Sequence, residues 1–159
     1  MSAAASFRTI LSILNSRQVE YVVIGGFASY VHGSGILTRD IDIVHRREPA
    51  NVRRLMDALL EMKAAYRTRP ELVPNESHLM STGHQLLITE YGRLDILGAA
   101  ASEDYETLAP QSEPVDLGLG VTARIVHLAT IIRLKEQAGR EKDLAALPVL
   151  RALLRRSQR

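Results

Sequence analysis

The hydrophobic and polar positions in the first third of the chain alternate between helical and strand-like patterns. Within residues 7–14, apolar side chains recur three and four positions apart, which predicts a helix. Residues 21–24, YVVI, form a continuous apolar run that ends at a glycine pair, as in a short buried strand. Residues 27–34 predict one or two helical turns, and residues 36–44, ILTRDIDIV, predict a second strand.

The middle of the chain continues this alternation and then becomes irregular. Pro49 opens a helix whose apolar residues repeat at helical spacing. Residues 66–84 contain two prolines and many polar positions, so we expect mostly loop with one short strand. Residues 85–97 predict a hairpin, in which the strands QLLIT and LDIL flank the tight turn EYGR.

The C-terminal third of the chain predicts one strand followed by helices. The strand is expected around residues 115–119. Thr122 is then interpreted as the cap of a helix that ends at Gly139, and the remaining residues predict a further helix that Pro148 breaks or restarts. The whole pattern favours a mixed α/β domain with helices at its C-terminal end.

Composition limits the number of domains and the kinds of site. The 159 residues are 46% hydrophobic, which fits one domain with a core of ordinary size. Cysteine is absent, so disulfide scaffolds and thiolate metal sites are excluded, oxygen atoms remain as metal ligands, and a reducing cytoplasm is the expected location. A formal charge of +2 does not by itself indicate nucleic acid as a partner, although a pI near 9.1 leaves that open. No apolar run approaches the roughly 20 residues that span a bilayer, so no membrane is expected.

Two aspartates in the second predicted strand carry the most specific chemistry. Side chains alternate along a strand, so Asp40 and Asp42 project from one face with Cα atoms roughly 6–7 Å apart, and Ile41 and Ile43 take the other face. Two carboxylates so close repel each other and raise each other's pKa unless a cation lies between them. Mg²⁺ would supply that cation; the alternative is a pair of polar residues on a solvent-facing strand.

A third acid, Asp95, lies in the second strand of the predicted hairpin. Leu94 and Ile96 take the face opposite to it. Alone it is more simply a structural residue. Combined with the aspartate pair, it would complete the three carboxylates that two metal ions about 3.5–4 Å apart need in order to assist a phosphoryl displacement.

The glycine pair after the first strand could bind phosphate. Gly25 and Gly26 would let backbone N–H groups approach an anion at the start of a helix. A plain turn is the alternative for this feature alone. His32, at the end of the predicted helical turns, is interpreted as a cap or packing residue in preference to a substrate contact.

In this order, the segments VIGG, HG, LTRDIDIV, GRLDIL and LKEQAGREKDL resemble the minimal nucleotidyltransferases of the DNA polymerase beta superfamily. The resemblance is strongest to the bacterial groups near aminoglycoside nucleotidyltransferases and the nucleotidyltransferase toxins of abortive-infection systems, and it spans roughly residues 20–145. It implies a small mixed β-sheet flanked by helices in one domain, residues 1–159, with a catalytic core at about 19–100 and a helical part at about 122–159.

The resemblance implies an enzyme that transfers NMP from an NTP to a hydroxyl acceptor and releases pyrophosphate. Asp40 and Asp42 would bind Mg²⁺ or Mn²⁺, with two ions expected, together with the triphosphate. Asp95 would complete the metal site and help to deprotonate the acceptor. The acceptor would be a small molecule, a protein side chain or the end of a tRNA.

Four further residues receive nucleotide-binding roles from the same resemblance. Gly25 and Gly26 would hold the phosphates, Thr38 would brace the turn into the acidic strand, and Lys135 would reach the triphosphate.

The chain departs from many relatives at two positions. It has Gly26 where they have serine, and Ile36 where they have an arginine two positions before the threonine. The missing arginine motivates the alternative of a non-catalytic or regulatory protein that keeps the fold and binds NTP. A toxin or antitoxin protein partner is a further expectation from the resemblance.

Overall fold

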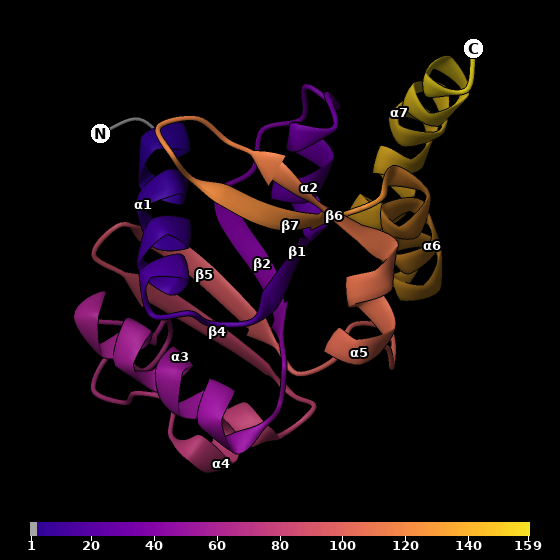
Figure 1. Cartoon of the computed structure of the whole chain (residues 1–159). Helices are drawn as coiled ribbons and strands as arrows, with labels where there is room; N and C mark the ends of the chain where they lie inside the picture. Colours follow the sequence, from indigo (N-terminus) through magenta and orange to yellow (C-terminus); the bar gives the residue numbers. More distant parts are fainter. Residues whose placement is uncertain (1–2) are drawn as a thin grey trace.

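The computed structural model describes residues 3–159, with side chains from residue 6 onward, and contains one seven-stranded mixed sheet in the order β3-β4-β5-β2-β1-β7-β6 (Figure 1). The strands are β1 (Tyr21–Ile24), β2 (Asp40–His45), β3 (Ala65–Tyr66), β4 (His84–Thr89), β5 (Gly92–Leu97), β6 (Ser112–Asp116) and β7 (Thr122–Val126). The helices are α1 (Ala3–Ser16), α2 (Gly25–Val31), α3 (Pro49–Glu61), α4 (Glu76–Met80), α5 (Tyr105–Leu108), α6 (Leu128–Ala138) and α7 (Glu141–Ser157), with a 3₁₀ turn, η1 (Ala109–Gln111). The mixed α/β class with C-terminal helices is confirmed.

The centre of the sheet is formed by three strands that are distant in sequence. Strand β2 pairs antiparallel with β1 and parallel with β5, and β1 also pairs parallel with β7. Antiparallel pairings β4–β5 and β6–β7 complete its two sides. The acidic strand β2 therefore lies between the glycine-terminated strand β1 and the strand that carries the third acid.

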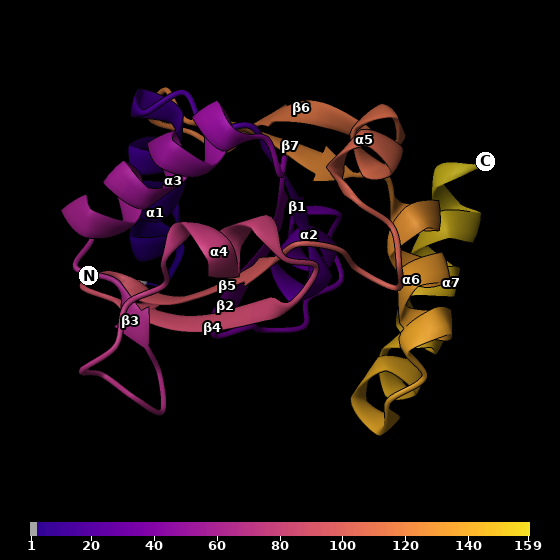
Figure 2. The same ribbon diagram turned by 90° about the horizontal axis from the view of Figure 1, so that it is seen from below.

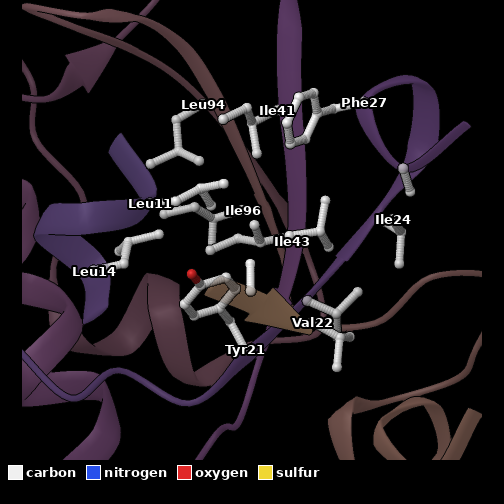
Figure 3. Close-up of a cluster of buried hydrophobic side chains, with 14 of the residues drawn as sticks. Leu11, Leu14, Tyr21, Val22, Ile24, Phe27, Ile41, Ile43, Leu94 and Ile96 are labelled. Atoms are coloured by element: carbon white, nitrogen blue, oxygen red, sulfur yellow. The ribbon is translucent and has the colours of Figure 1, made fainter. Parts of the chain in front are cut away.

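One face of these central strands packs against helix α1 to form the core. Ile41 and Ile43 of β2 and Ile96 of β5 are fully buried in the same cluster as Leu11 and Leu14 of α1 (Figure 3). Because side chains alternate along a strand, the aspartates between these residues point to the opposite face. Burial of the apolar face thus fixes the direction of the acidic side chains.

Helix α3 is held to the central strands through a buried polar residue. Pro49 occupies its first turn and the Glu48 side chain accepts a hydrogen bond from the Ala50 backbone N–H. Asn51 is fully buried and donates to the Glu20 and Arg46 carbonyls. This residue ties α3 to the segments that flank β1 and β2.

Helices α6 and α7 form an antiparallel pair on the opposite side of the molecule from α3 (Figures 1 and 2). Gly139 ends α6 in the left-handed conformation (φ 65°), as the sequence predicts. The predicted break at Pro148 is wrong, because α7 continues through it to Ser157. Proline removes only the hydrogen bond to the carbonyl of Leu144, a residue that is half exposed. Among residues 3–159, no helix is long and apolar enough to cross a membrane.

Several boundaries predicted from sequence are also wrong. Residues 36–39 are not part of β2, and Leu37 is 86% exposed because this segment has no strand partner. Thr122 does not cap a helix: residues 122–126 alternate between exposed and buried positions and form β7, which pairs with β6. The predicted strand at 115–119 begins earlier, at Ser112, and residues 117–121 form the turn between these strands. The predicted loop at 66–84 contains a short helix, α4, and the Asn75 side chain caps its N-terminus.

Candidate functional site

The three predicted acids share the face of the sheet that the core leaves open. Asp40 and Asp42 lie on β2 and Asp95 lies on the neighbouring parallel strand β5, where it is the register partner of Asp42. On the same ladder, Asp40 is the register partner of Arg93. The geometry brings together two acids separated by 53 positions in the sequence.

These acids line one end of a cleft of about 440 Å³ between the open sheet face and the α6–α7 pair. The volume lies within the range of small-molecule binding sites. Apolar side chains from β4, β5 and α6 also line it: Leu86, Leu97, Ile131 and Leu134. Among the residues predicted for the site, the cleft is lined by Gly25, Asp40, Asp42, Asp95 and Lys135.

Ionisation of the Asp42 carboxyl group is unfavourable in this environment. Burial, followed by repulsion from Asp95 and Asp40, raises the pKa of Asp42 to about 7, and Lys142 opposes this only in part. The closeness of the Asp95 carboxyl group also favours the protonated form of Asp42 through a side-chain hydrogen bond. Burial also raises the pKa of Asp95, while the hydrogen bond from Asp42 and the charge of Arg67 act in the opposite direction. Full ionisation of these two carboxyl groups is therefore unfavourable in the absence of another cation.

Arg67 is the charged partner that the sequence did not reveal. Its side chain forms an ion pair with Asp95 through Nη2, and Nη1 lies 3.9 Å from Asp40 Oδ1. Arg67 follows the two-residue strand β3 and belongs to the region that the sequence predicts as loop. No hydrophobic pattern surrounds it, and only the pairing of β3 with β4 brings it to the acids.

The acids fit a hard divalent cation in chemistry but are not arranged as a ready three-ligand site. Asp40 Oδ1 is buried and accepts no hydrogen bond. An oxygen of this kind, beside an acid pair whose full ionisation is unfavourable, is suited to a cation that prefers oxygen ligands. Within the described residues, however, no group of three or more histidine, cysteine, aspartate or glutamate side chains could hold a metal ion as they stand.

The glycine pair and Thr38 shape the turn beside the acids. Gly25 has φ +72°, and a Cβ atom there would fall on Asp42 Oδ2, so this position requires glycine. A Cβ at Gly26 would lie 2.9 Å from Thr38 Oγ1. Thr38 Oγ1 in turn accepts from the Asp40 backbone N–H at 3.3 Å and donates to the Asp40 carbonyl at 3.1 Å. Gly26 and Thr38 do not line the cleft; they lie against each other.

Basic side chains from α6, α7 and their connection form the wall opposite the acids. Lys135, Arg140 and Lys142 all line the cleft. Asp143, which is 2% exposed, accepts from Arg140 at 2.7 Å and lies 3.5 Å from Lys135 Nζ. These two cations lower the pKa of Asp143 against the effect of its burial. From sequence only Lys135 received a role, although Arg140 and Lys142 belong to the same LKEQAGREKDL segment.

His32 has the structural role that the sequence favoured. It caps the C-terminus of α2, and its Nε2 lies 2.9 Å from the carbonyl oxygen of Val126. His32 does not line the cleft beside the acids.

No protein-family model matches the chain, and no curated protein matches it in sequence. Its fold is similar to several solved structures, including the two that follow. The first is the antibiotic-resistance factor ANT(2'')-Ia, with a TM-score of 0.64 and 17% identity over 95% of this chain and 83% of that protein. The second, a protein of Thermotoga maritima provisionally named a nucleotidyltransferase, has a TM-score of 0.57 and 19% identity over 89% of this chain and 88% of that protein. These similarities establish the fold of the chain.

Proposed function

From the nucleotidyltransferase fold of this chain, we propose that it transfers NMP from an NTP to a hydroxyl acceptor in a reaction that depends on a divalent metal. The observation that carries the proposal is the polarity of the cleft. Acids gather at its sheet side and basic residues at its α6–α7 side, within one cavity of about 440 Å³. A metal–triphosphate complex has both kinds of charge and so matches both walls.

The chemistry assigns separate tasks to the two walls. Asp40 and Asp42 would hold Mg²⁺ or Mn²⁺, which would neutralise phosphate charge and orient the triphosphate when bound. Lys135, Arg140 and Lys142 would stabilise negative charge on the β- and γ-phosphates and on the departing pyrophosphate. Catalysis would then rest mainly on positioning and charge stabilisation.

In the transfer itself, the acceptor oxygen would form a bond to the α-phosphorus. The bond from that phosphorus to the bridging oxygen would break, and pyrophosphate would leave with the electron pair. Asp95 would take the proton of the acceptor hydroxyl. The acceptor classes remain a small molecule, a protein side chain and the end of a tRNA.

Thermal unfolding with each of the four NTPs, with and without Mg²⁺, tests binding. We expect one NTP with Mg²⁺ at about 100 times its Kd to raise the Tm by roughly 5–10 °C. The double variant Asp40→Asn/Asp42→Asn should lose this shift. Asp57→Asn, an exposed change on α3, is the matched control and should keep it.

A second candidate is a nucleotide-binding protein that does not transfer NMP. The engagement of Asp95 by Arg67 favours it, because the acid proposed to accept a proton is already paired. Asp95→Asn separates the two functions when binding is followed by the Tm shift and transfer by pyrophosphate release. An enzyme loses turnover and keeps NTP binding, whereas a binding protein shows no turnover before or after the change.

A further inference from the structure

The guanidinium of Arg67 lies where the acids need a positive charge. It pairs with Asp95 and has Nη1 at 3.9 Å from Asp40 Oδ1. Arg93 Nη1 is also 3.9 Å from Asp40 Oδ1, but the side chain of Arg93 is 44% exposed whereas that of Arg67 is 22% exposed. Arg67 is therefore the more enclosed of the two cations near these acids.

The surroundings of Arg67 leave part of its hydrogen-bonding capacity unused, which is unusual for a purely structural residue. Its Nε atom is buried and has no hydrogen-bond partner. Asp40 Oδ1, which it faces, is likewise buried without a partner. A permanent buried ion pair normally satisfies all of its polar atoms, because each unpaired one costs free energy. The contact is thus stabilised by charge and leaves both residues with unused bonding capacity.

The attachment of Arg67 would allow its side chain to leave the acids without disturbing the core. Its backbone N–H donates to the Leu86 carbonyl at 3.0 Å, just beyond the two-residue strand β3. Strand β3 is the outermost strand of the sheet and pairs only with β4. Residues 67–75 then run without a helix or strand up to α4. A rotation of the arginine side chain at this edge breaks no strand pairing.

A guanidinium on Asp95 and a divalent cation on the same carboxylate would repel each other. Building on the proposed function, we propose that Arg67 is a built-in counter-cation of Asp95. Arg67 has to release the Asp95 carboxylate before Asp95 can join Asp40 and Asp42 in binding a divalent metal. Arg67 is then a positioning residue that sets how readily the third acid becomes available.

Mn²⁺ binding without nucleotide, measured by titration calorimetry and electron paramagnetic resonance, tests this inference independently of turnover. Arg67→Ala should bind Mn²⁺ at least 10-fold more tightly than wild type. Arg67→Gln, which removes the charge and keeps much of the volume, should do the same, and Arg67→Lys should stay near wild type. Arg69→Ala, an exposed arginine of the same loop that pairs with Glu71, is the control for net charge and should change affinity less than 2-fold.

The Asp95→Asn background gives the specific readout. If Arg67 acts through Asp95, Arg67→Ala should gain almost no Mn²⁺ affinity once Asp95 is already neutral. Unchanged or weaker Mn²⁺ binding in folded Arg67→Ala and Arg67→Gln would overturn the inference, while the proposed function would stand if wild type binds the metal. Absence of Mn²⁺ binding in every variant, together with no NTP-dependent Tm shift, would overturn both.

Discussion

Asp42 and Asp95 are register partners on adjacent parallel strands, and burial together with repulsion from Asp95 raises the pKa of Asp42 to about 7. Their backbone positions are fixed by hydrophobic packing on the other face of the sheet, where Ile43 and Ile96 are fully buried. The protein therefore maintains an acid pair that is unfavourable without a cation. A site of this kind lowers the stability of the metal-free fold in return for affinity toward a positively charged ligand.

Asp42→Asn should stabilise the metal-free protein at high pH. Its pKa is raised from 3.8 to about 7 in the folded state, so Asp42 keeps its proton on folding and the stability it contributes falls as pH rises from about 4 to about 7. Asparagine removes this loss and can still donate to Asp95. We expect a gain of about 1–3 kcal/mol in the free energy of unfolding at pH 8, measured by urea denaturation in EDTA.

At pH 4 the same substitution should have little effect, because Asp42 is protonated in the folded protein there. Asp57→Asn on the exposed side of α3 is the control and should leave the pH profile unchanged. An equal effect of Asp42→Asn at pH 4 and pH 8 would mean that charge burial is not its cause.

Gly25→Ala should damage the site more than an equivalent change at another glycine with positive φ. Alanine at φ +72° is strained, and its Cβ would displace the Asp42 carboxyl. Gly33→Ala carries the strain of φ +98° but has no atom within 4 Å of the new Cβ. We expect the free energy of unfolding of Gly25→Ala to be about 1–3 kcal/mol lower than that of Gly33→Ala. Gly25→Ala should also bind Mn²⁺ at least 10-fold more weakly than Gly33→Ala. Equal behaviour of the two variants would show that the approach of Asp42 to Gly25 is unimportant.

Lys142→Ala should weaken NTP binding more than NMP binding. Lys142 lines the cleft opposite the acids and is exposed, so its attraction to the triphosphate is partly screened by solvent. We expect roughly a 3- to 10-fold loss of affinity for NTP with Mg²⁺ at low salt and a smaller loss at 0.5 M NaCl, by titration calorimetry. Lys63→Ala, which removes an exposed lysine paired with Glu90, should leave NTP affinity unchanged. Loss of NMP and NTP affinity to the same extent would place Lys142 away from the outer phosphates.

Asn51→Ala should destabilise the fold without a direct effect on the cleft. Asn51 is fully buried, donates to the Glu20 and Arg46 carbonyls and accepts from the Glu20 backbone N–H at 2.7 Å. Its loss removes three hydrogen bonds: the part-buried Glu20 N–H and Arg46 carbonyl lose this partner, whereas the Glu20 carbonyl keeps its bond from the Arg46 N–H. We expect a cost of about 2–4 kcal/mol in the free energy of unfolding. Mn²⁺ affinity of the folded fraction should stay within 2-fold of wild type. A loss below about 1 kcal/mol would mean that water replaces the amide group.

Local pattern was sufficient for the elements on which the acids depend. The run YVVI predicted β1 with its observed bounds, and the helix opened by Pro49 was confirmed. Alternation placed Asp40 and Asp42 opposite Ile41 and Ile43, because the period of a strand is fixed by its backbone.

Pattern failed where tertiary pairing decides the structure. The hydrophobic pattern of the short segment 122–126 does not by itself separate a strand from the start of a helix, and pairing with β6 selects the strand. Arg67 could not be identified from sequence because its partner Asp95 is 28 positions away. The roles of Arg140 and Lys142 were also hidden, since they depend on how α7 returns past α6 after the left-handed turn at Gly139.

The distance in sequence between the two walls of the cleft has a consequence for the order in which the protein acquires its site during synthesis. The acidic wall is complete once Asp95 has been made, but the basic wall comes from residues 135–142. A chain emerging from the ribosome therefore carries its three acids without their opposing cations for about 40 residues of elongation, roughly 2–8 s at typical rates. The cations that contact these carboxylates in the folded protein and precede Asp95 in the chain are Arg67 and Arg93, so both have already been synthesised during that interval.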